Sequence, residues 1–148
     1  MRVRIVLFLI CASLARSEFL RVEVYIRDMN CESCSTSLGE NFKRMRGVDT
    51  AEVDFKAATV RLALAEKNRV GVEQIWDAIK RVGFTPGETK VTVRGAVKGR
   101  KFEVPEIGKT FEIEGVAREG DSIQLTGVIT PPPDPRTPIV IRLDPAAK

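Results

Sequence analysis

The spacing of apolar residues changes repeatedly in the first half of the chain, and this order limits the fold more than any other feature. Residues 20–26 alternate apolar and polar side chains, as a half-buried strand does. A helical spacing follows from Cys34 to Met45 and is closed by Gly47. Apolar residues at 53 and 55 and alternation over 60–64 then predict two further strands joined by a turn.

A second helix is predicted next. Gly71 and Gln74 stand where an N-cap and its capping-box partner belong, and Gly83 stands at the C′ position. The order strand–helix–strand–strand–helix needs one more strand to complete a ferredoxin-like βαββαβ sandwich, an α+β fold. One face of this helix carries the apolar residues Val72, Ile75, Ile79 and Val82.

The remainder of the chain shows only strand-like alternation, interrupted by glycines. It predicts four or five antiparallel strands in a small barrel or sandwich. The proline-rich segment 131–138 is expected to be an extended crossing loop before the last strand. We therefore expect a domain over residues 18–94 and a small all-β domain over 95–148, with no recognisable chemistry in the second.

The N-terminus has the pattern of a secretory signal peptide over residues 1–17. A basic head precedes an uncharged apolar run, Ile5–Ala15, which is too short to span a bilayer. Small residues allow cleavage after Ala15 or after Ser17. The expected product is an exported, periplasmic or extracellular protein without a transmembrane helix. Its net charge would be about +1, and no basic stripe with interleaved aromatic residues predicts binding to nucleic acid.

The chain contains no histidine, which excludes Ser/His and Cys/His catalysis and histidine-ligated metals. After cleavage two thiols remain, Cys31 and Cys34, where the first strand meets the first helix. Two thiolates at this spacing can converge on one soft ion, such as Cu(I), Hg(II), Zn(II) or Cd(II). A helix N-terminus also lowers a thiol pKa from its usual value of about 8.5. The pair therefore predicts a metal-binding site in a protein that is not an enzyme.

The segment from Met29 to Cys34 resembles the M-x-C-x-x-C loop of heavy-metal-associated domains. These domains occur in copper chaperones, in the N-terminal modules of metal-pumping ATPases and in an exported mercury-binding protein. The resemblance covers about residues 19–94. It is also carried by Gly47-Val48, Val53-Asp54-Phe55, Ile75–Ile79 and Gly83-Phe84.

The resemblance implies a soft-metal-binding protein that binds or hands on one ion, Cu(I) before Hg(II), Zn(II) or Cd(II). It makes Cys31 and Cys34 the ligands and Met29 a packing anchor under the loop. It places Phe84 beside the metal as a shield and Asn30 in the supporting loop. The implied partner is a metal-transporting membrane protein or another metal-binding domain.

Other interpretations of the cysteine pair stay open. A periplasmic thiol–disulfide redox protein also places Cys-x-x-Cys at a strand-to-helix junction, although Asn30 stands where thioredoxin-like motifs have an aromatic residue. The β-rich portion could instead be an interaction module, with a structural or lapsed cysteine pair beside it. Asp28 and Glu32 make the loop more acidic than the family pattern. Either this acidity favours a divalent ion, or both carboxylates are simply solvated.

Overall fold

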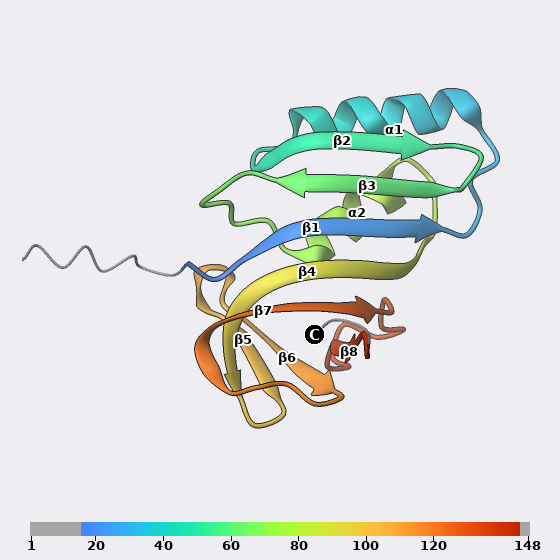
Figure 1. Ribbon diagram of the computed structural model, residues 1–148. Helices are drawn as coiled ribbons and strands as arrows, with labels where there is room; N and C mark the ends of the chain where they lie inside the picture. The colour runs from blue at the N-terminus through green and yellow to red at the C-terminus, as the bar shows by residue number, and fades with distance from the viewer. Residues whose placement is uncertain (1–15, 146–148) are drawn as a thin grey trace, which may run out of the picture.

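The computed structural model describes residues 16–145 and confirms the expected α+β fold (Figure 1). A ferredoxin-like βαββαβ unit is followed by a five-stranded β-barrel. The first unit consists of β1 (Glu18–Ile26), α1 (Glu32–Arg44), β2 (Val48–Asp54), β3 (Thr59–Leu64), α2 (Val72–Arg81) and β4 (Pro86–Lys98). The rest consists of β5 (Lys101–Val104), the 3-10 helix η1 (Pro105–Ile107), β6 (Lys109–Glu114), β7 (Gly120–Ile129) and β8 (Val140–Leu143).

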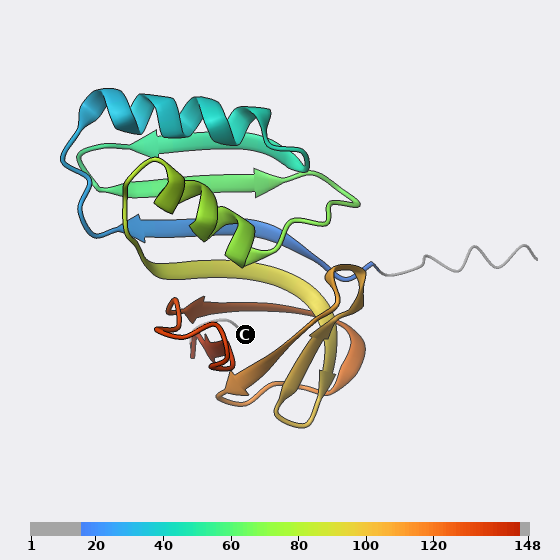
Figure 2. The same cartoon turned by 180° about the vertical axis from the view of Figure 1, so that it is seen from behind.

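The first unit is a four-stranded antiparallel sheet in the order β2-β3-β1-β4, with both helices on one face (Figures 1 and 2). Apolar residues recur at helical spacing in α1 and α2 and at every second position in the strands, so each element has one apolar face. These apolar faces of the helices and the sheet pack against each other. The predicted helix ends are confirmed: the Gly71 N–H donates to Gln74 Oε1 at 3.0 Å, and Gly83 has a φ of 98°. Among the fully buried side chains between the layers are Val24, Ile26, Leu38, Phe42, Ile75 and Ile79.

Strand β4 belongs to both halves of the molecule. One of its edges pairs with β1 over Pro86–Arg94 and then with β5 over Ala96–Lys98, and it also pairs with β7 from Thr89 to Val97. The strand order β4-β5-β6-β8-β7 returns to β4, so these five strands close a barrel. A side chain at Gly95 would collide with the Glu103 carbonyl oxygen and the Phe102 ring, and glycine lets β5 approach at this corner.

The barrel differs from the sequence expectation in one pairing and one strand. β6 and β8 are parallel, whereas all strands were expected to be antiparallel. The segment 130–139 makes this possible, because it carries the chain from the end of β7 to the start of β8, which lies between β6 and β7. Strand β5 was not among the expected strands, although Phe102 and Val104 alternate with polar residues, because a four-residue alternation is a short signal. The strand order of the whole barrel, β4-β5-β6-β8-β7, is that of a Greek-key barrel of the OB type.

Two strands of the first unit also differ in detail. Alternation over 20–26 would point Leu20 inward, but a register shift between Phe19 and Arg21 leaves Leu20 half-buried and Phe19 fully buried. Strand β2 begins at Val48, earlier than expected, because it pairs with β3 along the whole length of that strand. Phe55 lies in the turn beyond it.

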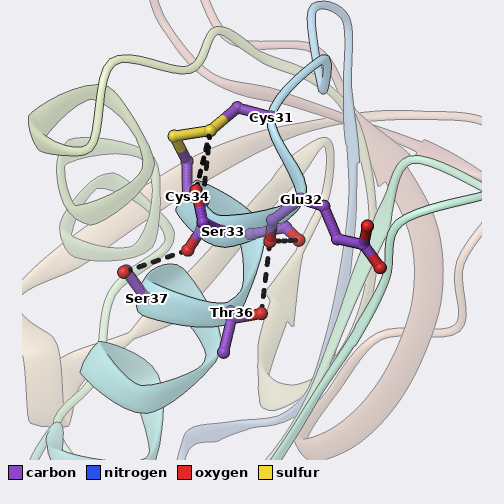
Figure 3. The surroundings of a disulfide bond; sticks show 7 residues. Cys31, Glu32, Ser33, Cys34, Thr36 and Ser37 are labelled. Atoms are coloured by element: carbon purple, nitrogen blue, oxygen red, sulfur yellow. Dashed lines mark hydrogen bonds between the residues drawn. A yellow bond between two sulfur atoms is a disulfide. The ribbon is translucent and has the colours of Figure 1, made fainter.

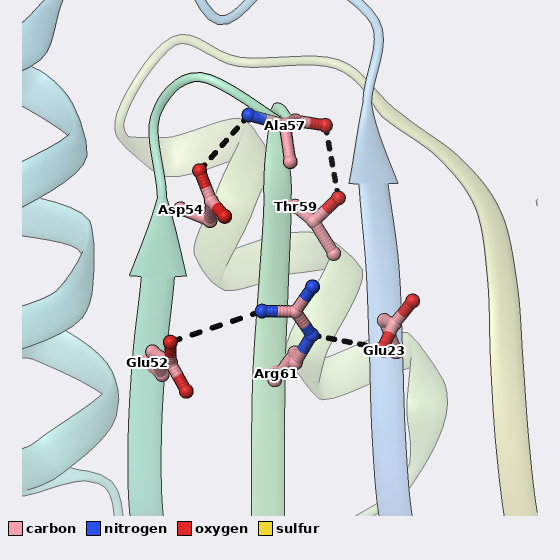
Figure 4. A network of polar contacts seen from close by, with 6 residues as sticks. All are labelled: Glu23, Glu52, Asp54, Ala57, Thr59 and Arg61. Atoms are coloured by element: carbon pink, nitrogen blue, oxygen red, sulfur yellow. Dashed lines mark hydrogen bonds and ion pairs between the residues drawn. The ribbon is translucent and has the colours of Figure 1, made fainter.

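The open face of the four-stranded sheet carries charged residues (Figure 4). Arg61 on β3 lies between two carboxylates, 3.1 Å from Glu23 Oε2 on β1 and 3.8 Å from Glu52 Oε1 on β2. Pairs this exposed contribute at most about 1 kcal/mol each to stability. In the β2–β3 turn the Ala57 N–H donates to Asp54 Oδ1 at 2.9 Å. These contacts join neighbouring strands and close the turn between β2 and β3.

The two halves share one apolar core. The rings of Phe19 on β1 and Phe111 on β6 meet edge-to-face with their centroids 5.8 Å apart. Lys109 on β6 pairs with Glu73 on α2 at 2.7 Å. The expected boundary between residues 94 and 95 falls inside β4 and stays a prediction.

We predict that Phe111→Ala destabilises the whole described chain by about 3–5 kcal/mol, because it removes a fully buried ring from the shared core. Trp76 in α2 is the only tryptophan, and its indole N–H donates to Thr89 on the shared strand β4, so its fluorescence follows α2 and the junction between the halves. Urea unfolding followed at Trp76 should show a lower midpoint for this barrel variant. Val116→Ala is the control, since Val116 is 99% exposed. An unchanged Trp76 midpoint in Phe111→Ala would instead favour two independent domains.

Candidate functional site

The two cysteines lie where β1 gives way to α1 (Figure 3). Cys31 is the N-cap residue of the helix and Cys34 lies in its first turn. They are joined by a disulfide, with their Cα atoms 5.2 Å apart. Both residues are half-buried and pack against the core. The fold therefore holds the two sulfur atoms side by side at an accessible edge.

The start of α1 points donors at the Cys31 sulfur. The Cys34 N–H donates to Cys31 Sγ at 3.2 Å, which is the capping bond of the helix. The Ser33 hydroxyl lies 3.4 Å from the same sulfur. Unpaired N–H groups at a helix N-terminus favour negative charge. The position therefore suits a sulfur that carries negative charge when the disulfide is reduced.

The other polar side chains of this turn are occupied within the helix. Ser35 Oγ donates to the Glu32 carbonyl oxygen at 2.6 Å, and Thr36 Oγ1 donates to the same oxygen at 3.2 Å. Ser37 Oγ donates to the Ser33 carbonyl oxygen at 3.1 Å. Figure 3 shows the Glu32 carboxylate directed away from the sulfur atoms. None of these groups adds an obvious third ligand.

A clamp between Asp28 and Thr85 joins the cysteine loop to the segment after α2. The Thr85 N–H donates to Asp28 Oδ1 at 2.7 Å, and its hydroxyl donates to Oδ2 at 2.8 Å. These two bonds hold the pKa of the Asp28 carboxyl below its usual range. The Arg27 N–H also donates to the Thr85 carbonyl oxygen at 3.1 Å. Asp28 is therefore not merely solvated.

The supporting residues expected from the sequence occupy different environments. Met29 is half-buried and packs against the core, as a packing anchor would. Phe84 is buried and directly precedes Thr85, so the clamp ties its segment to the cysteine loop. Asn30 is exposed. No sequence pattern indicates the Asp28–Thr85 contact, because the two residues are far apart in the chain and their pairing depends on the fold.

Within residues 16–145, no group of three or more Cys, Asp or Glu side chains is arranged to hold a metal ion. The described residues also contain no helix long and apolar enough to cross a lipid bilayer. On the barrel, the ring of Phe102 on β5 is buried, as is that of Phe111 on β6. These strands therefore present no aromatic platform on which bases could stack.

Comparison with known proteins agrees with this geometry. Residues 23–85 match the model of the heavy-metal-associated domain. The copper chaperone CopZ of Staphylococcus haemolyticus (strain JCSC1435) is 34% identical over 61 residues, which are 41% of this chain and 88% of that protein.

Solved structures are also similar to part of the chain. A CopZ metallochaperone has 23% identity and a TM-score of 0.41, with 45% of this chain and 97% of that chain covered. Oxidized MerP from Ralstonia metallidurans CH34 has 16% identity and a TM-score of 0.41, with 46% and 93% covered. Through residues 23–85, the chain belongs to the heavy-metal-associated domain family.

Proposed function

We propose that the reduced chain binds one soft metal ion between the sulfur atoms of Cys31 and Cys34, with Cu(I) as the first candidate. The observation that carries the proposal is the placement of both sulfurs side by side at the N-terminus of α1. Thiolates select Cu(I), Hg(II), Zn(II) and Cd(II) over Mg²⁺ and Ca²⁺. Membership of a heavy-metal-associated family and the likeness to a copper chaperone support the same choice.

The site suits transfer better than permanent storage. Structural zinc sites have four protein ligands, whereas the described residues bring only these two sulfurs together. An ion with two protein ligands leaves positions open, so a thiolate of a partner can attack it. The ion is therefore cargo, and its chemistry is ligand exchange without catalysis. The partner that fits is another thiol-bearing metal-binding domain, alone or within a metal-transporting membrane protein.

The Asp28–Thr85 clamp fixes the surroundings of this exchange. It holds the segment carrying Phe84 against the loop that leads to Cys31. Phe84 offers no charge or hydroxyl to the ion, so its contribution is to exclude water from the buried side of the site. Met29 supports the same loop by packing. These assignments make the two sulfurs the only protein atoms that contact the ion.

The chain is proposed to act outside the cytoplasm, on the basis of the signal-peptide pattern in residues 1–17. The signal-peptide prediction lies mostly outside the described residues. Ser17 is only 7% exposed and directly precedes β1. Cleavage after Ala15 keeps this buried residue, whereas cleavage after Ser17 removes it. A mature N-terminus at Arg16 is therefore the better choice.

A thiol–disulfide redox function is the second candidate, and the disulfide between Cys31 and Cys34 is the observation that favours it. The two functions differ in what the reduced pair does. A metal carrier competes with a chelator for Cu(I), whereas a redox protein exchanges electrons with dithiols and does not require an ion. The interaction-module interpretation predicts neither behaviour.

We predict that Cys31→Ser and Cys34→Ser each weaken Cu(I) binding more than about 100-fold, since even changes to groups behind the ligands cost 10–100-fold. Serine stays protonated at neutral pH and is a poor ligand for a soft ion. Anaerobic titration of the reduced protein against a competing Cu(I) chelator measures the effect, with one ion expected per chain. Ser37→Ala is the matched control, because its hydroxyl bonds only to the helix backbone. Tight binding in the Cys31/Cys34 double variant would eliminate the site.

We also predict a pH-dependent contribution of the clamp to stability. The pKa of Asp28 is lowered by folding, so the clamp stabilises the fold above the usual aspartate pKa and loses this effect as the pH falls through the lowered value. Asp28→Ala should therefore lower the urea midpoint at pH 7, and the gap from wild type should narrow as the pH falls below the usual aspartate pKa of about 3.9. Thr85→Val removes the hydroxyl bond but keeps the backbone N–H bond, so it should show a smaller gap in the same direction. A gap that stays constant with pH would contradict this assignment.

A further inference from the structure

An unpartnered carboxylate oxygen lies at the junction between the two halves of the molecule. It is Oε2 of Glu106 in η1, the short 3-10 helix between β5 and β6. This atom is buried and accepts no hydrogen bond within the part of the chain that the structure describes. Buried polar atoms nearly always have a partner, so an exception calls for an explanation.

The start of the described chain lies against this carboxylate. The Ser17 N–H and hydroxyl both donate to Glu106, and since Oε2 has no partner, they bond to the other oxygen. Figures 1 and 2 show the segment between β5 and β6 beside the beginning of β1. Ser17 and Glu18 are both buried. The chain is therefore enclosed from Ser17 onward, at the end of β1 away from the cysteines, which the proposed metal function does not use.

The Glu106 carboxyl is ionised at neutral pH. Burial raises its pKa, but the hydrogen bonds from Ser17 and the positive charge of Arg16 lower it more, so the pKa of Glu106 lies below its usual range. An ionised oxygen forms its strongest hydrogen bonds with a positively charged donor. The free Oε2 atom is therefore suited to an ammonium or guanidinium group.

The hollow beside Glu106 already contains two cations. It is lined by Arg69, from the loop before α2, and by Lys109 at the start of β6. Lys109 pairs with Glu73 on α2 at 2.7 Å. Within residues 16–145, neither cation forms an ion pair with Glu106. The free oxygen therefore remains available to a further donor.

Cleavage after Ala15 creates such a donor next to it. Hydrolysis of the Ala15–Arg16 peptide bond by a leader peptidase consumes one water, leaves a carboxylate on Ala15 and frees the nitrogen of Arg16 as an amine. An α-amine has a usual pKa of about 7.7–8.0, so at neutral pH it takes up a proton and becomes an ammonium group. Neighbouring backbone nitrogens are at most about 3.6 Å apart, and the Ser17 nitrogen already bonds to Glu106. The new charge therefore forms within a few ångströms of Oε2.

We propose that Glu106 binds the processed N-terminus of its own chain, with the α-ammonium group of Arg16 donating to the free Oε2 atom. This ion pair depends on the proposed cleavage after Ala15, whereas every group in it belongs to the described chain. It joins the start of β1 to η1 of the barrel, across the junction where the two halves share a core. In the precursor the same nitrogen is an uncharged amide. The chain therefore gains stability when its leader is removed.

A double-mutant cycle on residues 16–148, which include every described residue, measures this ion pair. The N-terminus is either free or acetylated, and position 106 carries either the native Glu106 or Glu106→Gln. Acetylation restores the uncharged amide of the precursor. In urea unfolding at about pH 6.5, where the α-amine is protonated, acetylation should raise the unfolding constant about tenfold in the native chain. In Glu106→Gln it should raise that constant less than about twofold.

Two further variants separate the α-ammonium group from the neighbouring cations. Arg16→Gln is the matched control, because it removes the side-chain charge at the same residue and keeps the α-ammonium group. Arg69→Gln removes the cation of the hollow that lies beside Glu106. In both variants acetylation should still raise the unfolding constant about tenfold.

An equal effect of acetylation with Glu106 and with Glu106→Gln would overturn the proposal. Loss of the effect in Arg16→Gln would overturn it as well, since the guanidinium group would then be the partner. The intact mass of the exported chain tests the cleavage itself: a mature N-terminus at Arg16 supports the proposal, and one at Glu18 removes both Arg16 and Ser17 and contradicts it. None of these measurements involves metal, so their failure leaves the Cu(I) titration independent.

Discussion

Strand β4 hydrogen-bonds to strands of both halves of the molecule and so joins the four-stranded sheet to the barrel. It completes the four-stranded sheet by pairing with β1, its later residues pair with β5, and its other edge pairs with β7 to close the barrel. A strand bonded on both edges cannot leave one partner without disturbing the other. The ring contact between Phe19 and Phe111 adds a shared core across the same junction. The stability of the βαββαβ unit therefore depends on the barrel as well, because the barrel strands β5 and β7 hydrogen-bond to β4 at the edge of its sheet.

The sequence predicted the first unit well because local periods and long-range packing agree there. Helical spacing from Cys34 to Met45 and the glycines that close both helices are local signals, and tertiary contacts preserved them. Prediction failed where pairing between distant segments decided the outcome. The register shift after Phe19 and the early start of β2 depend on partner strands. The parallel pairing of β6 with β8 likewise has no counterpart in either segment's own sequence.

At the candidate site, too, local signals could be recognised in the sequence and contacts between distant residues could not. Cys31 and Cys34 could be named from the sequence, since their spacing at a strand-to-helix junction is itself the signal. Asp28 could not be assigned a role, because its two hydrogen bonds go to Thr85, a residue 57 positions away. A carboxylate in a loop is usually solvated, and only the fold reveals a partner. The identity of the ion and of its partner depends on molecules other than this chain, so no residue pattern encodes them.

The strand order of the barrel also has a consequence for how the chain folds. β8 lies between β6 and β7 and closes the ring, yet it follows both in the sequence. Until Val140–Leu143 has been synthesised and has docked, the barrel has two unpaired strand edges. Open edges are where a strand can pair with another chain, and parallel pairings between distant segments form slowly. The period before β8 docks is therefore when this protein is most exposed to aggregation, and when a chaperone would protect it most.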